Sequence, residues 1–209
     1  MPESGHLFVI AAPSGTGKTT LVKTLVEAVP KITVSISHIT RAKRPAETHG
    51  VNYYFVEKSE FQRMIKQGEL LEYATVFGNY YGTSRRFVEE RLQQGIDVIL
   101  EIDWQGHQQI RRLFPNMISI FILPPSLEGL KERLIKRQQD GPEIIQQRLK
   151  DVTETMSHIH EFDYVVFNDN FDHALAELKT IIEAIRLRTP EQTKKYKDLI
   201  SELVTISTE

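Results

Sequence analysis

A group of glycines, hydroxyls and one lysine directly follows a short apolar run near the start of the chain. The stretch APSGTGKT comes after LFVIA and fits the phosphate-loop pattern G-x-x-x-x-G-K-[ST], except that Ala12 replaces the first glycine. In such a loop Gly15 and Gly17 let backbone N–H groups converge on phosphate oxygens, and the following helix adds its positive N-terminal end. The spacing therefore predicts a polyphosphate site built from Ala12, Pro13, Ser14, Gly15, Thr16, Gly17, Lys18 and Thr19.

Two side chains of this loop, and two acids further along, suit phosphate chemistry. Lys18 would reach the β- and γ-phosphates, and the Thr19 hydroxyl would ligate Mg²⁺. The run VILEID ends in Glu101 and Asp103, which face the same side of a strand because they are two residues apart. Acids at the carboxyl end of a parallel strand can hold Mg²⁺ or its water ligands. The sequence leaves open which acid lies nearer the metal, and a pair of surface acids is the alternative.

Positive charge gathers in residues 131–150, where six Lys or Arg stand against three acids. Arg133 and Arg137 are four residues apart and share one face of a predicted helix. Gly141 and Pro142 then interrupt the helical pattern. Because charge spreads over the transferred group in phosphoryl transfer, arginines that close over it accelerate the reaction. The segment about 130–150 is therefore interpreted as a lid, with a solvated helix face as the alternative.

The elements that must position these residues alternate between strand and helix. Short runs that are apolar on consecutive residues predict strands buried on both faces, at Leu7 to Ala12, Ile32 to Ser37, Val98 to Ile102, Ile118 to Leu123 and Tyr164 to Phe167. Amphipathic stretches predict helices at Lys18 to Val29, Phe61 to Ile65 after the capping-box pattern SEFQ, Thr83 to Gln94, and Leu127 to Gln139. This order favours an α/β doubly wound parallel sheet, whose ligands lie beyond the carboxyl ends of the strands.

One stretch breaks the alternation. Residues from Arg41 to Gly82 are rich in Gly, Tyr, Arg and turn residues, and they are interpreted as an inserted lobe. Tyr80 and Tyr81 stand between Gly78 and Gly82, which is a poor place for an aromatic core. The lobe therefore needs another use for its charges and rings.

The chain resembles guanylate kinase, and bacterial members of that family most of all. The likeness runs from about Leu7 to about Arg188 through APSGTGKT, TRAKRP, HGVNYYFV, FGNYYGTS, IDWQG, FILPPS and VVFND. It implies a P-loop NTPase-type α/β fold over residues 4–188. That fold would carry a GMP-binding lobe at about 37–87, a helical lid at about 130–150, and a C-terminal helical extension at 189–209. Ala12, Glu101 and Ile39 depart from the pattern, and Glu101 leaves the acid nearest the metal in doubt.

The resemblance also assigns roles to individual residues. It implies that the GMP phosphate is held by Arg41, Arg44, Tyr53 and Tyr81. It implies that Glu72, Ser37 and Thr83 read the guanine. The residues expected to bind GMP also include Glu101 and Asp103. It implies that Arg133, Arg137 and Arg148 bind the transferring phosphates. It also implies that Asn168 and Asp169 lie near the adenine of ATP. The alternative for these two residues is a plain turn.

Base chemistry agrees with the role given to Glu72. Guanine offers adjacent N–H donors at N1 and N2 that one carboxylate can accept, whereas adenine presents a lone pair at N1 that would repel it. Arginine suits the monophosphate because its planar fork binds two oxygens at once. The acceptor oxygen is already anionic, so no general base is expected.

Composition limits the other possibilities. A chain of 209 residues can bury a full core, and its formal net charge of −2 gives no general attraction for nucleic acid or anionic lipid. There is no cysteine and no basic leader before an apolar stretch, so a cytoplasmic protein without a membrane partner is expected. His158 and His160 are interpreted as surface or capping residues. The apolar spacing between Pro190 and Val204 predicts a helix that packs on the core or on a second subunit, which leaves a homo-oligomer open.

The function predicted is transfer of the γ-phosphoryl group of ATP to GMP, and to dGMP, giving ADP and GDP with Mg²⁺. A binding module that has kept the fold but lost the activity is one alternative, although Lys18 and the lid arginines are present. A kinase for another nucleoside monophosphate is the second alternative, which Glu72 and Thr83 argue against.

Overall fold

The computed structural model describes residues 4–76, 78–136 and 152–206. Its centre is a parallel sheet in the order β2-β7-β1-β8-β9. The strands are β1 (Leu7–Ala11), β2 (Ile32–Val34), β7 (Asp97–Glu101), β8 (Ile118–Leu123) and β9 (Tyr164–Phe167). The predicted parallel sheet is therefore confirmed, although β2 ends three residues before Ser37. After Val34 the chain leaves the sheet at the carboxyl end of β2.

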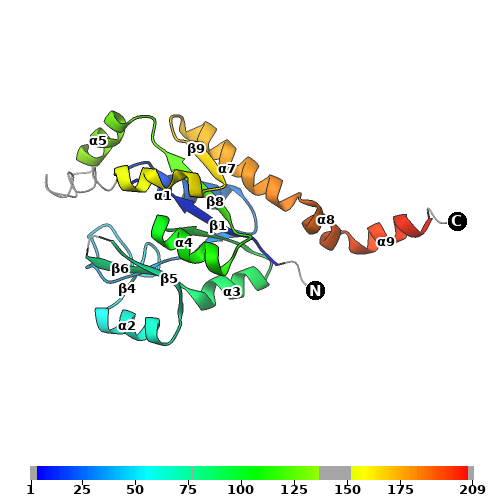
Figure 1. Ribbon diagram of the computed structural model, residues 1–209, viewed down its shortest axis with the longest axis horizontal. Helices are drawn as coiled ribbons and strands as arrows, with labels where there is room; N and C mark the ends of the chain where they lie inside the picture. The colour runs from blue at the N-terminus through cyan, green and yellow to red at the C-terminus, as the bar shows by residue number, and fades with distance from the viewer. Residues whose placement is uncertain (1–3, 77, 137–151, 207–209) are drawn as a thin grey trace.

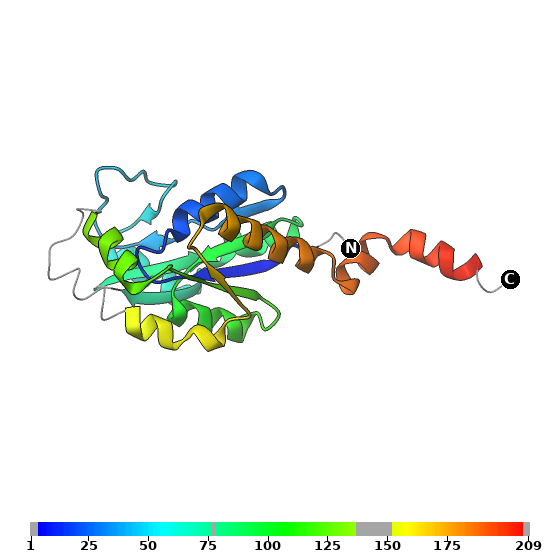
Figure 2. The same ribbon diagram turned by 90° about the horizontal axis from the view of Figure 1, so that it is seen from above.

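Helices cover both faces of this sheet, as the strand composition requires. Alternate side chains of the strands form one core with α1 (Lys18–Ala28) and α7 (Phe171–Arg186), where Phe8, Ile10 and Ile120 are fully buried. The opposite side chains, among them Val9 and Phe121, form a second core with α3 (Arg85–Gln93) and α4 (Trp104–Leu113). Figure 2 shows α1 and α7 on one side of the sheet and α4 on the other. The doubly wound α/β class is confirmed.

A second sheet of four strands lies beside the first, in the order β4-β3-β6-β5. Its strands are β3 (His38–Ile39), β4 (Tyr54–Phe55), β5 (Leu70–Val76) and β6 (Asn79–Ser84), and its helix is α2 (Lys58–Lys66). Phe61 and Met64 of α2 pack with Leu70 in a small core of their own. In Figure 1 this unit lies below the parallel sheet, and β6 leads from it into α3.

Two predicted helix starts are wrong. Helix α2 begins at Lys58 with Glu57 as its N-cap and no side-chain cap, so Ser59 lies inside the first turn and makes no capping box. The predicted helix at Thr83 begins at Arg85, because Thr83 pairs with Glu72 in the β5–β6 ladder. Ser84 caps α3 instead, where its hydroxyl accepts from the Phe87 backbone N–H at 3.4 Å.

The C-terminal helices project away from the rest of the molecule (Figure 1). These are α8 (Thr189–Lys195) and α9 (Lys197–Ile206). Leu199, Leu203 and Val204 are 51%, 57% and 63% exposed, so the prediction that this face packs on the core is wrong. Packing on a second subunit stays a prediction. Among the described residues, none of the helices has the length and apolar character needed to cross a membrane.

The structure describes only the first part of the predicted lid, residues 130–136, and the helix that follows the lid. Helix α5 (Leu127–Lys136) follows β8, and residues 152–157 form the next described helix. Leu130 of α5 packs against Val152. Arg137 and Arg148 lie outside the described residues, and of Arg133 only the backbone position on α5 is described.

Candidate active site

A cleft of about 650 Å³ opens where the carboxyl ends of the parallel strands face the four-stranded sheet. Most of the residues predicted to bind nucleotides line it: Ala12, Pro13, Ser14, Gly15, Thr16, Gly17, Lys18, Thr19, Ser37, Arg41, Arg44, Tyr53, Glu72, Tyr81, Glu101 and Asp103. Other lining residues were not predicted, namely Ala74, Thr75, Val76, Ile102, Trp104, Gln105, Val152, Glu154 and Thr155. The two predicted anion sites are thus parts of one cleft.

The phosphate loop is held from beneath by Asn168. The buried Asn168 amide donates to the Thr16 carbonyl at 2.7 Å, and the Thr16 hydroxyl donates to the Pro13 carbonyl at 2.8 Å. Gly17 is the N-cap of α1 with φ 95°, and a Cβ there would come within 2.8 Å of the Asn168 Nδ2 atom. Both the backbone conformation and the close approach therefore require glycine at this position.

Asn168 thus supports the phosphate loop, whereas Asp169 makes a local contact with its own turn. Asn168 lies under the loop, and the Asp169 carboxylate accepts from the Asn170 backbone N–H at 2.7 Å. The Asp169 contact matches the turn alternative stated above, and the Asn168 contact was not predicted. A contact with adenine remains a prediction for both residues.

Lys18 and the two predicted acids, Glu101 and Asp103, lie close together beside the phosphate loop. The Lys18 ammonium reaches back to the Ile10 carbonyl at 3.4 Å, and burial lowers its pKa, while Glu101 and Asp103 oppose that shift. The Thr19 hydroxyl donates to Glu101 at 3.2 Å. Asp103 is occupied as the N-cap of α4, where its carboxylate accepts from the Gly106 backbone N–H at 2.9 Å. The geometry therefore pairs Glu101, and not Asp103, with the loop hydroxyl.

An acid that sequence reasoning missed holds Arg41 in place. Glu47 forms a two-point ion pair with the Arg41 guanidinium, at 2.5 and 2.7 Å, and also accepts from the Arg44 backbone N–H. The guanidinium lies over the rings of Tyr53 and Phe55, 5.3 and 5.8 Å from their centroids. Glu47 lies in the same short loop as both arginines, which is the signal that could have found it.

Beside Arg41 lie the two predicted tyrosines. Tyr53 meets Tyr81 edge to face, with ring centroids 6.3 Å apart. Burial raises the pKa of the Tyr53 hydroxyl, with a smaller contribution from Tyr81, so Tyr53 stays a hydrogen-bond donor at neutral pH. Ser37 and Arg44 line the same part of the cleft. The pocket therefore offers two guanidinium groups and phenolic donors to one anion.

Glu72 is the buried acid of the cleft. It is 3% exposed and accepts from the Thr83 hydroxyl at 2.6 Å, a contact set by the β5–β6 register. Burial raises the pKa of Glu72 to about 7, the Thr83 hydrogen bonds oppose this, and the charge of Asp103 adds to it. A Cβ on Gly106 would lie 2.8 Å from the Glu72 carboxylate, so glycine is needed for α4 to approach it.

Comparison with known proteins agrees with this arrangement. A family model described as guanylate kinase matches residues 4–185. The chain belongs to the guanylate kinase family. The guanylate kinase of Coxiella burnetii is 55% identical over 95% of this chain and 97% of its own length. That of Hahella chejuensis is 54% identical over 92% of this chain and 93% of its own length.

A solved structure supports the same family. The crystal structure of guanylate kinase from Anaplasma phagocytophilum is 34% identical, with a TM-score of 0.76 over 90% of this chain and 89% of that one. As a member of the guanylate kinase family the chain is a phosphotransferase, and its P-loop NTPase-type fold is that of the family.

Proposed function

We propose that this cleft transfers the γ-phosphoryl group of ATP to GMP, the activity of the guanylate kinase family, by means of the residues described above. One observation carries the proposal: Glu72, which accepts from the buried Thr83 hydroxyl, lines the same cleft as the phosphate loop, whereas Thr83 itself does not line it. A carboxylate there accepts the adjacent N–H groups of guanine and repels the N1 lone pair of adenine. dGMP keeps the same base edge and phosphate, so it is expected to be an acceptor as well.

On the donor side, the backbone of Ala12 to Gly17 would surround the ATP phosphates, and Lys18 would neutralise the β- and γ-oxygens. The Thr19 hydroxyl oxygen and a Glu101 carboxylate oxygen lie 3.2 Å apart. Such a pair fits Mg²⁺, which binds one or two protein oxygens and keeps several water ligands. When bound, Mg²⁺ would neutralise charge on the phosphates. Thr19 would hold it directly and Glu101 through water, with Asp103 kept for the α4 cap.

On the acceptor side, the GMP phosphate would bind Arg41, Arg44, Tyr53 and Tyr81, and Ser37 would donate to the base beside Thr83. An oxygen of this phosphate attacks the γ-phosphorus. The bond between the γ-phosphorus and the β,γ-bridging oxygen breaks, and ADP leaves with that electron pair. The attacking oxygen is anionic, so no proton must be removed, and positioning and charge neutralisation supply the rate enhancement.

The proposed domain organisation and the proposed roles of the remaining residues follow from the same function. Residues 4–188 would form the transferring domain, with the acceptor lobe at 37–87 and the lid at 130–150, followed by the extension at 189–209. Arg133, Arg137 and Arg148 would neutralise the transferring group from the lid, and Asn168 and Asp169 would lie near the adenine.

The test is ADP formation from Mg-ATP with GMP, dGMP, AMP, UMP and TMP. Turnover with GMP and dGMP alone is expected. Equal turnover with AMP would contradict the guanine assignment, and no turnover with any acceptor would favour the inactive binding module.

A matched pair of lysine variants on α1 tests the phosphate loop. Lys18→Ala is expected to reduce kcat by at least roughly 10³-fold, since one preorganised charge-stabilising group contributes about 10²–10³ and Lys18 meets two phosphates. Lys23→Ala, whose side chain is 76% exposed on the same helix, should keep wild-type kcat. Full activity of Lys18→Ala would remove Lys18 from the mechanism.

A further inference from the structure

The one tryptophan of the chain lines the cleft but has no part in the proposed chemistry. Trp104 is the first residue of α4, directly after the Asp103 cap. Its ring lies flat on the imidazole of His158, with centroids 3.7 Å apart and an interplanar angle of 8°. Neither residue was predicted to carry chemistry, and the structure brings them together from different elements.

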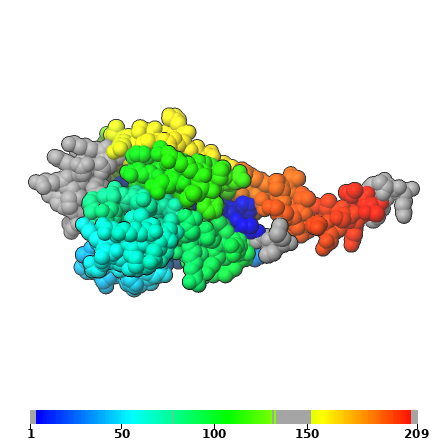
Figure 3. Space-filling view, turned by 60° about the horizontal axis from the view of Figure 1, so that its bottom comes forward, coloured from blue at the N-terminus to red at the C-terminus, as the bar shows by residue number. Residues whose placement is uncertain are grey.

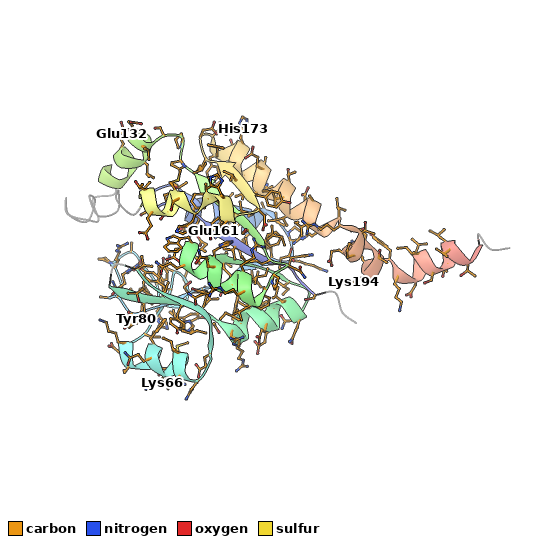
Figure 4. All side chains as sticks on the ribbon, in the orientation of Figure 1. Lys66, Tyr80, Glu132, Glu161, His173 and Lys194 are labelled. Atoms are coloured by element: carbon orange, nitrogen blue, oxygen red, sulfur yellow. The ribbon has the colours of Figure 1, made fainter. Side chains whose placement is uncertain are left out.

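The stack is one of three contacts along a single face of α4. One turn after Trp104, His107 stacks on Phe162 with centroids 4.1 Å apart. The Gln108 amide donates to Glu161 at 3.0 Å, and Glu161 pairs in turn with His158 at 2.6 Å. Residues 104, 107 and 108 share a helix face, so α4 presents a continuous surface to residues 158–162. Figure 4 shows Glu161 beside α4.

These contacts hold a wall of the cleft. Residues 152–157 form the helix that leads into His158, and Val152, Glu154 and Thr155 line the cleft. Figure 3 shows the surface of this helix, in yellow, directly against the green surface of α4. Because His158 immediately follows the helix, its stack on Trp104 sets where the helix ends relative to α4.

The other side of α4 is fastened to the strand that carries Glu72. The Gln109 amide donates to the Tyr73 carbonyl at 2.8 Å and accepts from the Tyr73 N–H at 3.2 Å. Gly106 lies directly against the Glu72 carboxylate. Helix α4 therefore connects the base-selecting strand β5 with the wall at 152–157.

We propose that Trp104 is a positioning residue for phosphoryl transfer. Through its stack on His158 it fixes the wall formed by residues 152–157 relative to the acceptor side on β5. The inference rests on the proposed function, since it concerns the geometry of the same cleft. A misplaced wall lets the two nucleotides depart from in-line geometry, and such departures reduce the rate of the chemical step more than they reduce binding.

Steady-state kinetics of four variants test this: Trp104→Leu, Trp104→Phe, His158→Ala and the double variant Trp104→Leu/His158→Ala. Trp104→Leu is expected to lower kcat on the order of tenfold, with KM for GMP within about threefold because Glu72 and the arginines remain. Trp104→Phe keeps an aromatic face and should restore most of the loss. If the two residues act through their stack, the double variant loses no more than Trp104→Leu alone.

Leu113→Ala is the matched control, since Leu113 ends the same helix and is 50% exposed. It should retain wild-type kcat. A kcat of Trp104→Leu within twofold of wild type, a change in KM alone, or a double variant that loses the product of the two single losses would overturn the inference.

Fluorescence of the single tryptophan separates this inference from the proposed function. His158→Ala should shift or intensify the emission of Trp104, and GMP with a non-hydrolysable ATP analogue should change the wild-type emission. Unchanged emission in both experiments would overturn the inference even if turnover with GMP is normal. Absent turnover with a normal emission response would instead contradict the proposed function.

Discussion

Two carboxylates of this protein, Glu72 and Asp97, are equally buried at 3% exposure, yet their surroundings shift their pKa values in opposite directions. Burial raises the pKa of Glu72 to about 7, against the hydrogen bonds of Thr83. Burial would also raise the pKa of Asp97, but contacts with His6 and Arg186 outweigh it, so the Asp97 pKa lies below its ordinary value. The two pKa values shift in opposite directions because His6 and Arg186 lie beside Asp97, whereas Thr83 and Asp103 lie beside Glu72.

Asp97 stands at the amino end of β7, away from the cleft, and is paired on both oxygens. One oxygen accepts from the His6 backbone and approaches the His6 ring at 3.1 Å, and the other accepts from Arg186 at 2.8 Å. Glu72 faces the cleft with Thr83 beside it and Asp103 adding negative charge. Asp97, a structural carboxylate, is thus supplied with cations, whereas Glu72 keeps acceptor capacity, as its proposed role in binding guanine requires.

The largest expected effect sharpens the comparison at Glu72. Glu72→Gln should lower kcat/KM for GMP by about 10²–10³-fold, because the amide turns an acceptor into a partial donor against guanine. The melting temperature should be unchanged or higher, since the variant removes a buried charge that has no cation partner in the part of the chain that the structure describes. Steady-state kinetics and thermal unfolding at pH 8 check both parts. A large loss of stability would place Glu72 with Asp97 as a structural group.

Asp97→Asn should give the opposite result. The substitution removes the negative charge that pairs with His6 and Arg186 in a buried site. The free energy of unfolding should therefore fall by about 3 kcal/mol. The kcat/KM for GMP should stay within twofold at a temperature where the variant is folded. Denaturant unfolding measures the first quantity. Glu177→Gln, an exposed carboxylate on α7, is the control and should lie within about 0.5 kcal/mol of wild type.

Acidity should weaken GMP binding through Glu72. Guanine binds the ionised carboxylate, so a proton competes with GMP as the pH falls through the pKa of about 7. From pH 8 to pH 6 the ionised fraction falls roughly tenfold, and KM for GMP should rise by the same factor. The phosphate of GMP also titrates near pH 6, so Glu72→Gln is measured in parallel. Equal pH profiles for both proteins would assign the effect to the substrate.

The smallest expected effect concerns His6. Its pKa is raised by the hydrogen bond to Asp97, against burial, with help from Glu191. A raised pKa contributes stability that is fully present below the unfolded value near 6.5 and is lost as the pH rises through the folded value. His6→Gln should therefore lower the free energy of unfolding by about 1 kcal/mol at pH 6 and by less at pH 8.5. A difference that grows with pH would refute the pairing.

Much of the fold and the donor site could be predicted from the sequence because the signals are local. Consecutive apolar residues in β1 and β8 identify strands buried on both faces, and the spacing of Gly15, Gly17 and Lys18 identifies a phosphate loop. Helix starts were harder to predict. Thr83 has a helical neighbourhood in the sequence, but its pairing with Glu72 across the ladder keeps it in a strand.

Contacts between distant segments could not be predicted in this way. No local pattern indicates that Asn168 supports the Thr16 carbonyl or that His158 stacks on Trp104. The same is true of Asp97, whose partners come from the start of the chain and from α7.

The sequence by itself determined which side chains are available: the loop proposed to bind phosphate, the arginines and tyrosines, and the acid proposed to select guanine. The tertiary structure alone decided their electrostatic state. A carboxyl group has nearly the same pKa on any unfolded chain, and only burial and the neighbours brought by folding separate Glu72 from Asp97.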